Sequence, residues 1–374
     1  MKSWLAPIAA VAALAGAAPA VAELLAVMTY ESKPGGNPRR EGIAIMELDR
    51  ASPRFGQIVR DIALPPDLVA HHVYLDPEGG KAYITALGKP ELRIMNAKTF
   101  DVAVVPVPDC QVGEDVAFSR KTGLWYLTCM GSSVMIVGDR SSDKPLRTVK
   151  LPAPYPHGIA VHDGIGRILL TSTVRPSDLK DPGEVVQELE LAGEKAVATH
   201  KIGGKPSPAG SAPVEVVFIP NSQPPKAYAT AMYEGALWLG SWNSVDKTFA
   251  WKRVADFAAM GQGLPLEIHY NAQGTRAFVS TANPGHLNVF DIGRPEQPKL
   301  LHAVKTGGGA HHMVFSPDGK LAYVQNSFLN LPGMHEGTIS VVDIEAGKVV
   351  ATIDTLSKQG LTPNNIELLT GGHR

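Results

Sequence analysis

Short hydrophobic stretches that alternate with polar residues recur along the chain, and a tight turn separates them in pairs. In GAHHMVFSPDGKLAYV at 309–324, Met313 and Phe315 alternate before Ser-Pro-Asp-Gly, and Leu321 and Tyr323 alternate after it. This pattern is typical of two antiparallel strands joined by a turn. The competing architecture, a two-domain α/β protein, needs crossover helices, and no long segment has the 3.6-residue hydrophobic period of such a helix.

The strand–turn–strand pattern is repeated along the sequence. Its copies begin at residues 71, 114, 157, 215, 266 and 311. Most are followed by a third strand and several by a fourth, and the spacing of about 40 to 60 residues is that of a four-stranded propeller blade. The segment 364–369 supplies a lone inner strand, and 23–64 supplies three more strands. We therefore predict an all-β, seven-bladed β-propeller over 23–374, closed where the C-terminal inner strand joins the N-terminal strands.

The first residues have the form of a secretory signal peptide. Lys2 precedes an apolar run to about Ala18, and Ala20-Val21-Ala22 has the small residues that signal peptidase requires. We assign 1–22 to the signal peptide, with cleavage after Ala22. A retained membrane anchor is the alternative, but the run is shorter than the ~20 residues of a membrane span. We expect a periplasmic mature chain with no stable membrane insertion.

Charge and composition limit the classes of partner. The 374 residues carry a formal net charge of -1, which provides no basic surface for nucleic acid and no cationic face for a membrane. The 37 Gly and 30 Pro are spread along the chain, as a fold of many short strands and turns requires. Small polar molecules and small thiols remain as candidate ligands.

Polar residues gather where the predicted inner strands begin, at one mouth of the central channel. The paired positions are His71-His72, Glu114-Asp115, His157-Gly158, Glu215-Val216, Leu266-Glu267, His311-His312 and Asn364-Asn365. Side chains alternate along a strand, so we expect only one member of each pair to face the channel. We favour the first members, although a shift of one residue would bring in Glu267.

Imidazoles that converge from three blades beside carboxylates suit a transition metal, and copper or zinc fits better than a hard cation. We predict His71, His157 and His311 as metal ligands, with His72 and His312 as alternative ligands or as supporting residues. A water-filled channel whose polar rim binds only solvent is the alternative interpretation.

The two cysteines flank the hairpin of the second predicted blade. Cys110 precedes its first strand and Cys129 follows its second strand, which places both at the same mouth. We predict a Cys110–Cys129 disulfide in an oxidising compartment. A thiolate ligand or nucleophile is the alternative. The sequence contains no phosphate-binding glycine loop, CxxC, HExxH or nucleophile elbow.

Several segments, in the same order, resemble the selenium-binding protein and methanethiol oxidase family, and SPDGKLAYVQN also fits the broader class of YVTN-type propeller repeats. The segments that carry the family resemblance are DRASPRFGQIVRDIALPPDLVAHH at 49–72, APVEVVF at 212–218, VFDIGRPEQPKLL at 289–301 and EGTISVVDI at 336–344. There are also departures. The family's Cys-containing loop after the His-His pair has no Cys here, and two family histidines fall near Gln111 and at Asn365.

The resemblance implies a seven-bladed periplasmic copper enzyme that oxidises methanethiol or a similar small thiol with O2. His71 and His72 carry over from the family motif, and Glu215 carries over as a carboxylate at the mouth. On this interpretation Glu215 or Glu114 accepts the thiol proton. The alternative is a non-enzymatic propeller that binds a metal or ligand or serves as an interaction scaffold.

Overall fold

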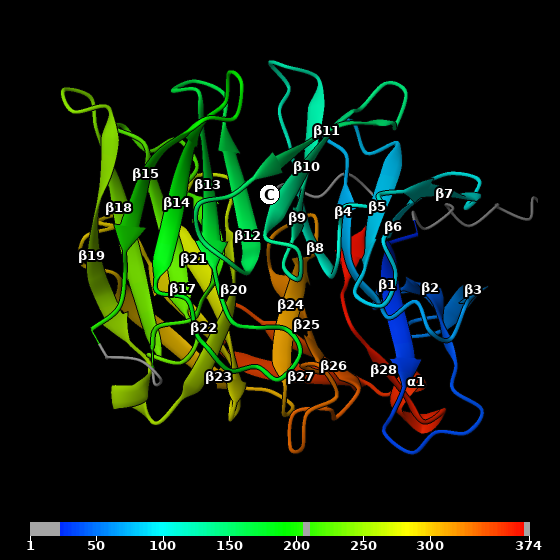
Figure 1. Cartoon of the computed structure of the whole chain (residues 1–374). Coiled ribbons are helices and arrows are strands. Elements are labelled where there is room, and N and C mark those ends of the chain that lie inside the picture. Colours follow the sequence, from blue (N-terminus) through cyan, green and yellow to red (C-terminus); the bar gives the residue numbers. More distant parts are fainter. Residues whose placement is uncertain (1–22, 205–209, 370–374) are drawn as a thin grey trace, which may run out of the picture.

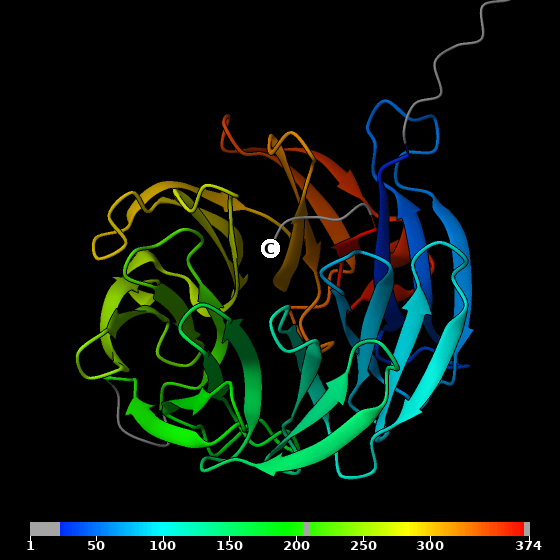
Figure 2. The same cartoon turned by 90° about the horizontal axis from the view of Figure 1, so that it is seen from above.

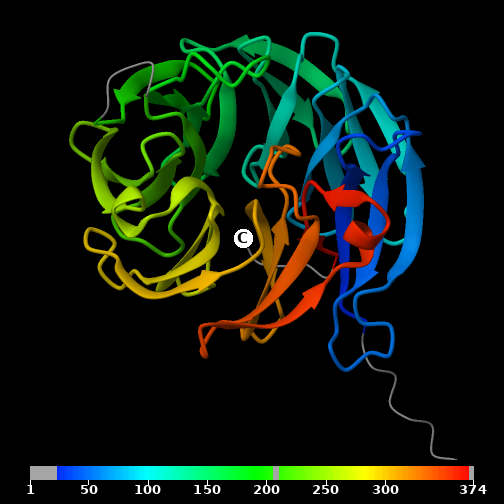
Figure 3. The ribbon, with the colours of Figure 1, turned by 90° about the horizontal axis from the view of Figure 1, so that it is seen from below.

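The computed structural model describes residues 23–204 and 210–369. Seven β-sheets surround a central axis, which confirms the predicted seven-bladed propeller (Figures 1 and 2). The chain passes round the ring in sequence order, so its N-terminal and C-terminal strands meet (Figure 3). The expected signal peptide, 1–22, lies outside the described residues. Among the described residues, no helix has the length and apolar character needed to cross a membrane.

The first three blades follow one another along the chain, each running from the channel outward. Blade 1 contains β4 (Ala70–Leu75), β5 (Lys81–Ala86), β6 (Glu91–Asn96) and β7 (Val102–Pro106). Blade 2 contains β8 (Gly113–Phe118), β9 (Leu124–Cys129), β10 (Val134–Asp139) and β11 (Pro145–Lys150). Blade 3 contains β12 (Pro156–His162), β13 (Arg167–Ser172), β14 (Val185–Glu190) and β15 (Ala196–Lys201).

The next three blades repeat this order. Blade 4 contains β16 (Pro213–Phe218), β17 (Lys226–Ala231), β18 (Ala236–Asn243) and β19 (Thr248–Asp256). Blade 5 contains β20 (Gly263–Tyr270), β21 (Arg276–Asn283), β22 (Gly285–Asp291) and β23 (Lys299–Lys305). Blade 6 contains β24 (Ala310–Phe315), β25 (Leu321–Asn326), β26 (Thr338–Asp343) and β27 (Lys348–Ile353). The described helices are short: η1 (Ala258–Met260) and α1 (Thr355–Lys358).

Blade 7 joins the two ends of the chain, as predicted. Its strands are β1 (Leu25–Ser32), β2 (Glu41–Glu47) and β3 (Ile58–Leu64), with β28 (Leu361–Pro363) and β29 (Glu367–Leu368) on the inner side. Both C-terminal strands pair antiparallel with β1. The inner strand therefore begins three residues before the predicted 364–369 and is interrupted between β28 and β29. This pairing covers the edge that β1 would otherwise expose.

The hydrophobic core lies mainly between adjacent blades. One buried cluster joins Val27 and Ile43 of blade 7 to Val73 and Ile84 of blade 1. Another brings Trp125 of blade 2 against residues of blade 1. Because each blade packs on its neighbours, the inner strands are held at fixed positions around the channel.

Candidate metal centre

In each of blades 1 to 6, the inner strand contains a β-bulge near its start, at the mouth of the channel. In blade 1, Ala70 pairs with Ala86 and Val73 pairs with Ile84, so His71 and His72 together oppose Thr85. A bulge of this kind interrupts the alternation of side chains. The rings of His71 and His72 stack with centroids 3.9 Å apart, and both reach side chains of other blades. The expectation that only one member of each pair reaches the channel is therefore wrong.

The bulge also corrects the alignment of blade 4. Pro213 pairs with Ala231 and Val216 pairs with Ala229, so the bulged residues are Val214 and Glu215 rather than the predicted Glu215 and Val216. Glu215 thus occupies the second bulge position, which His72 occupies in blade 1. The first position of blade 4 is apolar, as it is at Leu266 in blade 5.

Threonine and serine hydroxyls hold the bulged backbone in place. The Thr85 hydroxyl accepts a hydrogen bond from the His72 N–H at 3.0 Å. In blade 2, Thr128 accepts from the Asp115 N–H at 3.0 Å and donates to the His157 carbonyl of blade 3 at 2.7 Å. The same side chain therefore fixes the bulge of one blade and the position of the next blade.

Two carboxylates at the mouth each face two imidazoles. Glu114 Oε2 lies 3.4 Å from His71 Nε2 and 3.6 Å from His157 Nε2. Glu267 Oε1 lies 3.5 Å from His311 Nε2, and its Oε2 lies 3.6 Å from His312 Nδ1. All of these residues are buried. The structure therefore brings all five predicted histidines to one place, together with Glu114.

His72 lies between these groups. Its ring centroid is 4.5 Å from that of His312 and 5.7 Å from that of His157. Candidate ligand atoms of His72, Glu267, His311 and His312 all lie within 4.8 Å of one another, as do those of His71, His72 and Glu114. Such spacing allows several donor atoms to reach one ion.

Asp115 fixes which nitrogen of His72 is available. His72 Nδ1 lies 2.7 Å from Asp115 Oδ1, and the Tyr74 hydroxyl donates a hydrogen bond to the same oxygen. A carboxylate accepts the Nδ1 proton, which leaves Nε2 as the nitrogen with a lone pair free to bind a metal. His72 Nε2 is buried and has no hydrogen-bond partner among the described residues.

The electrostatics of the buried site favour neutral imidazoles. Burial lowers the pKa of His157 to about 4 and that of His311 to about 3. Burial, followed by the neighbouring histidines, holds the pKa of His71 well below its ordinary value. These rings are therefore neutral at pH 7, which is the form that binds metals.

The two carboxyl groups of blade 2 differ. Burial, and then the nearby Asp115 and Glu267, raises the pKa of Glu114 well above its ordinary value. Burial alone would raise the pKa of Asp115, but the hydrogen bond from His72 and the positive charge that His157 and His72 carry when protonated lower it overall. Asp115 is therefore the ionised carboxylate, and Glu114 is the stronger base.

Glu215, the other predicted proton acceptor, has a different environment. It is buried, and its Oε1 accepts a hydrogen bond from the Val216 N–H at 2.8 Å. It packs closely against Gly158, where an added Cβ would lie 2.9 Å from Glu215 Oε1 and 2.5 Å from the Val214 carbonyl oxygen.

Two carboxyl groups that were not predicted as site residues also belong to the cluster. The structure places Glu267 and Asp115 in direct contact with imidazoles.

Apolar side chains border part of the site. The Phe328 ring stands edge-on to His311 with centroids 5.4 Å apart. Phe328 also belongs to a hydrophobic cluster with Val214 and Leu266, the apolar first positions of blades 4 and 5. This side of the mouth therefore helps to shield the imidazoles from water.

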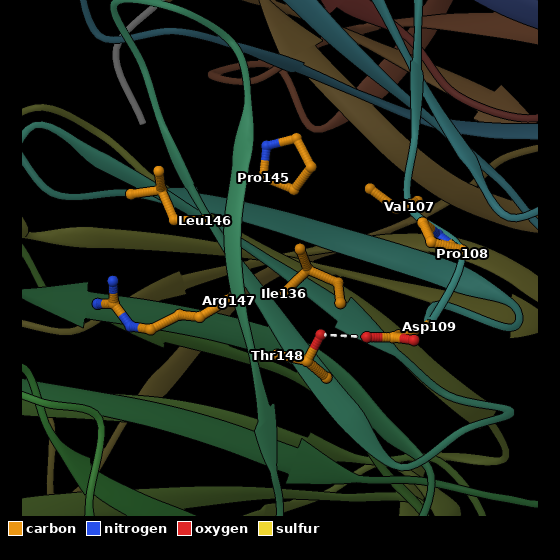
Figure 4. Close-up of a pocket in the computed structure, with 8 residues that line it drawn as sticks. All are labelled: Val107, Pro108, Asp109, Ile136, Pro145, Leu146, Arg147 and Thr148. Atoms are coloured by element: carbon orange, nitrogen blue, oxygen red, sulfur yellow. Dashed lines mark hydrogen bonds between the residues drawn. The ribbon is translucent and has the colours of Figure 1, made fainter.

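Two further features lie outside the cluster. Cys110 and Cys129 form a disulfide with their Cα atoms 5.1 Å apart, which confirms the predicted pairing. A pocket on the outside of blades 1 and 2 is lined by residues such as Ile136, Leu146 and Arg147, and the Thr148 hydroxyl donates to Asp109 there at 2.6 Å (Figure 4). None of its lining residues belongs to the histidine cluster.

Comparison with known proteins supports the architecture. No protein-family model matches the chain, and no curated protein matches its sequence. A hypothetical selenium-binding protein from Sulfolobus tokodaii has a similar structure, with a TM-score of 0.75 and 14% identity over 94% of both chains. A functionally unknown protein from Desulfotomaculum acetoxidans has a TM-score of 0.65 and 15% identity, covering 92% of this chain and 98% of that one. Kuenenia stuttgartiensis hydrazine synthase has a TM-score of 0.56 and 14% identity, covering 75% and 78%. At these identities the likeness establishes the propeller fold.

Proposed function

We propose that this propeller binds a transition metal at the channel mouth, with copper as the leading candidate and zinc as the alternative. The observation that carries the proposal is the buried convergence of five imidazoles and two carboxylates from five blades. The donor set fits the metal, since imidazole and carboxylate ligands suit both copper and zinc. His72 Nε2 and Glu114 Oε2 are buried without hydrogen-bond partners among the described residues, and a cation would satisfy both.

The resemblance to the methanethiol oxidase family supports a proposed redox activity on a small thiol. The balanced reaction converts methanethiol, O2 and water to formaldehyde, hydrogen sulfide and hydrogen peroxide. Bound copper would supply an electron path from the thiolate substrate, whose methyl carbon is the atom oxidised, to O2. Glu114 has the raised pKa of a strong carboxylate base and would take the thiol proton, with Glu215 as the alternative base. The Cys110–Cys129 disulfide and the expected signal peptide support a periplasmic location for this chemistry.

The burial of the cluster favours a second candidate, a metal carrier or scaffold without catalysis. His71 and His157 are only 5% and 8% exposed, and Phe328 covers part of the mouth. A carrier needs the ligands but no path for a substrate. A peroxide assay with methanethiol separates the candidates: copper-dependent peroxide formation supports the oxidase, and metal-loaded protein without turnover supports the carrier.

Metal content tests the binding proposal directly. His71→Ala, His157→Ala and His311→Ala should each lower the metal content of purified protein, because each removes a donor from a different blade. His269→Ala is the control, since its ring packs near Phe315 with centroids 6.0 Å apart and should affect stability more than metal content. Equal metal content in the wild type and the three mouth variants would exclude the site.

A further inference from the structure

The C-terminal inner strand of blade 7 also carries a bulge. Its pairs with β1 on either side of the break are Pro363 with Tyr30 and Glu367 with Val27. These pairs enclose three residues on the inner strand but only two on β1. One extra residue on one strand is what makes a bulge, and Asn365 is the second residue after the last pair of β28.

Asn365 therefore occupies in blade 7 the position that His72 occupies in blade 1 and His312 in blade 6. The threonine of this arrangement is present as well. Thr29 lies opposite the bulge, and its hydroxyl donates to the His71 carbonyl of the next blade, as the corresponding threonine of blade 2 does toward blade 3. Blade 7 thus contributes an asparagine to the same ring of positions that supplies the imidazoles.

The neighbours of blade 7 bring their imidazoles together in front of it. Blade 7 lies between blades 6 and 1, and β29 lies against both β24 and β4. The rings of His312 from blade 6 and His72 from blade 1 have centroids 4.5 Å apart. Asn365 is therefore the residue of blade 7 placed beside this pair of imidazoles.

The side-chain amide of Asn365 is buried without a partner. The residue is 0% exposed, and neither Nδ2 nor Oδ1 has a hydrogen-bond partner among the described residues. Because both atoms are unpaired, exchanging the two in the amide would not change this result. Its neighbour Asn364, by contrast, donates from Nδ2 to the Ala70 carbonyl at 3.0 Å. An unpaired buried amide is costly and rare, so its partner is to be sought outside the described chain.

A metal ion alone cannot be that partner. The amide Nδ2 is a hydrogen-bond donor, and it needs an acceptor rather than a cation. The amide oxygen suits hard cations better than copper. The lone pair of His72 Nε2 is available to a metal, whereas Nδ2 of Asn365 is available to an electron-rich atom. A small ligand bound to the metal would bring such an atom next to the imidazoles.

We propose that Asn365 binds the exogenous ligand of the metal at the mouth, a small anion such as a thiolate, through a hydrogen bond donated by its Nδ2. This inference rests on the proposed metal-binding function. The metal holds the anion through its charge, and the amide holds it through a directed donor. Since the rings of His71, His157 and His311 are neutral at pH 7, this donor adds a polar contact that imidazoles bound to a metal do not supply to the anion.

Azide serves as the probe of this subsite, because it is a small anion that gives a charge-transfer band when it binds copper(II). The full mature chain is loaded with copper(II) and titrated with azide. Asn365→Leu, which removes the amide at similar volume, should bind azide about 10- to 100-fold more weakly, as expected for one lost hydrogen bond to a charged acceptor. Its copper content should equal that of the wild type, because the amide is not a metal ligand.

The stability of the metal-free protein gives a second measurement. Asn365→Leu should raise the urea midpoint, since an unpaired buried amide is replaced by an apolar side chain. Asn364→Leu is the matched control from the adjacent position. It should lower the midpoint, because the Ala70 carbonyl loses its donor, and it should leave azide affinity unchanged.

The outcomes separate this inference from the function on which it rests. A wild type that binds neither copper nor zinc overturns both. Copper-loaded Asn365→Leu with the azide affinity of the wild type overturns the inference alone and leaves water as the partner of the amide. Copper loss in Asn365→Leu also overturns it, because the amide would then be a metal ligand. A urea midpoint lowered as far as that of Asn364→Leu overturns it as well. If the leucine variant does not fold, Asn365→Ala is measured in the same way, with the same expected loss of azide affinity.

Discussion

Replacing Thr128 with valine removes the hydroxyl that joins blades 2 and 3 while nearly preserving side-chain size. The Thr128 hydroxyl accepts from the Asp115 N–H at 3.0 Å and donates to the His157 carbonyl at 2.7 Å, and the residue is fully buried. Leaving a buried donor or acceptor without a partner costs about 1 to 3 kcal/mol, with carbonyls at the lower end. We therefore expect Thr128→Val to lower the free energy of unfolding by about 2–4 kcal/mol.

Urea unfolding of the metal-free protein measures this change. Thr128→Ser is the matched control, because it retains the hydroxyl and loses one methyl group, which costs about 1 kcal/mol. The valine variant should be less stable than the serine variant. A valine variant within 1 kcal/mol of the wild type, or one more stable than the serine variant, would refute the role given to this hydroxyl.

Three further experiments test the closure of the ring, the contribution of the disulfide and the pH dependence of stability. Removing 361–374 should abolish cooperative thermal unfolding, because β1 loses its inner partner; a melt near the wild-type temperature would contradict ring closure. Replacing Cys110 and Cys129 with alanine should lower the unfolding free energy by about 3 kcal/mol, estimated from the 19-residue separation; unchanged urea stability would argue against this. The lowered pKa values of His71, His157 and His311 mean that the metal-free unfolded chain gains protons first as pH falls below about 6.5. With one of these three protons offset by Glu114, whose pKa is raised, two remain, so stability should fall by up to about 2.7 kcal/mol per pH unit between pH 6 and 4.5; pH-independent urea curves would oppose this.

The repeated strand pattern was sufficient to predict the architecture. Alternating residues around each turn, as in Met313 to Tyr323, mark the two inner strands of a blade, and their spacing sets the number of blades. The closure by the C-terminus could be predicted because the N-terminal segment supplies three strands without an inner strand. The C-terminal segment supplies an inner strand without the other three. Its break between β28 and β29 could not be predicted, because it depends on pairing with β1 rather than on local sequence.

The site was predicted only in part, because the rule of alternation fails at a bulge. That rule selected His71 over His72 and left out Asp115 and Glu267, although the structure brings all four to the mouth. A sequence signal was available: a Thr or Ser, such as Thr85, lies near the end of the second strand in most blades. Its hydroxyl binds the second bulged residue, and this relation would also have aligned Glu215 correctly.

The repeated bulge has a consequence for how such a protein diversifies. In blades 1, 2, 4 and 5 a hydroxyl accepts a hydrogen bond from the backbone N–H of the second bulged residue, so the pairing of the blade does not require a particular side chain at the bulged positions. Blade 5 accordingly carries Leu266 and Glu267 where blade 1 carries His71 and His72. Duplicated blades can therefore exchange one donor at a time while the ring stays closed. A new set of donor side chains at the channel mouth therefore needs only point substitutions. A site assembled from irregular loops would also need coordinated changes in the backbone.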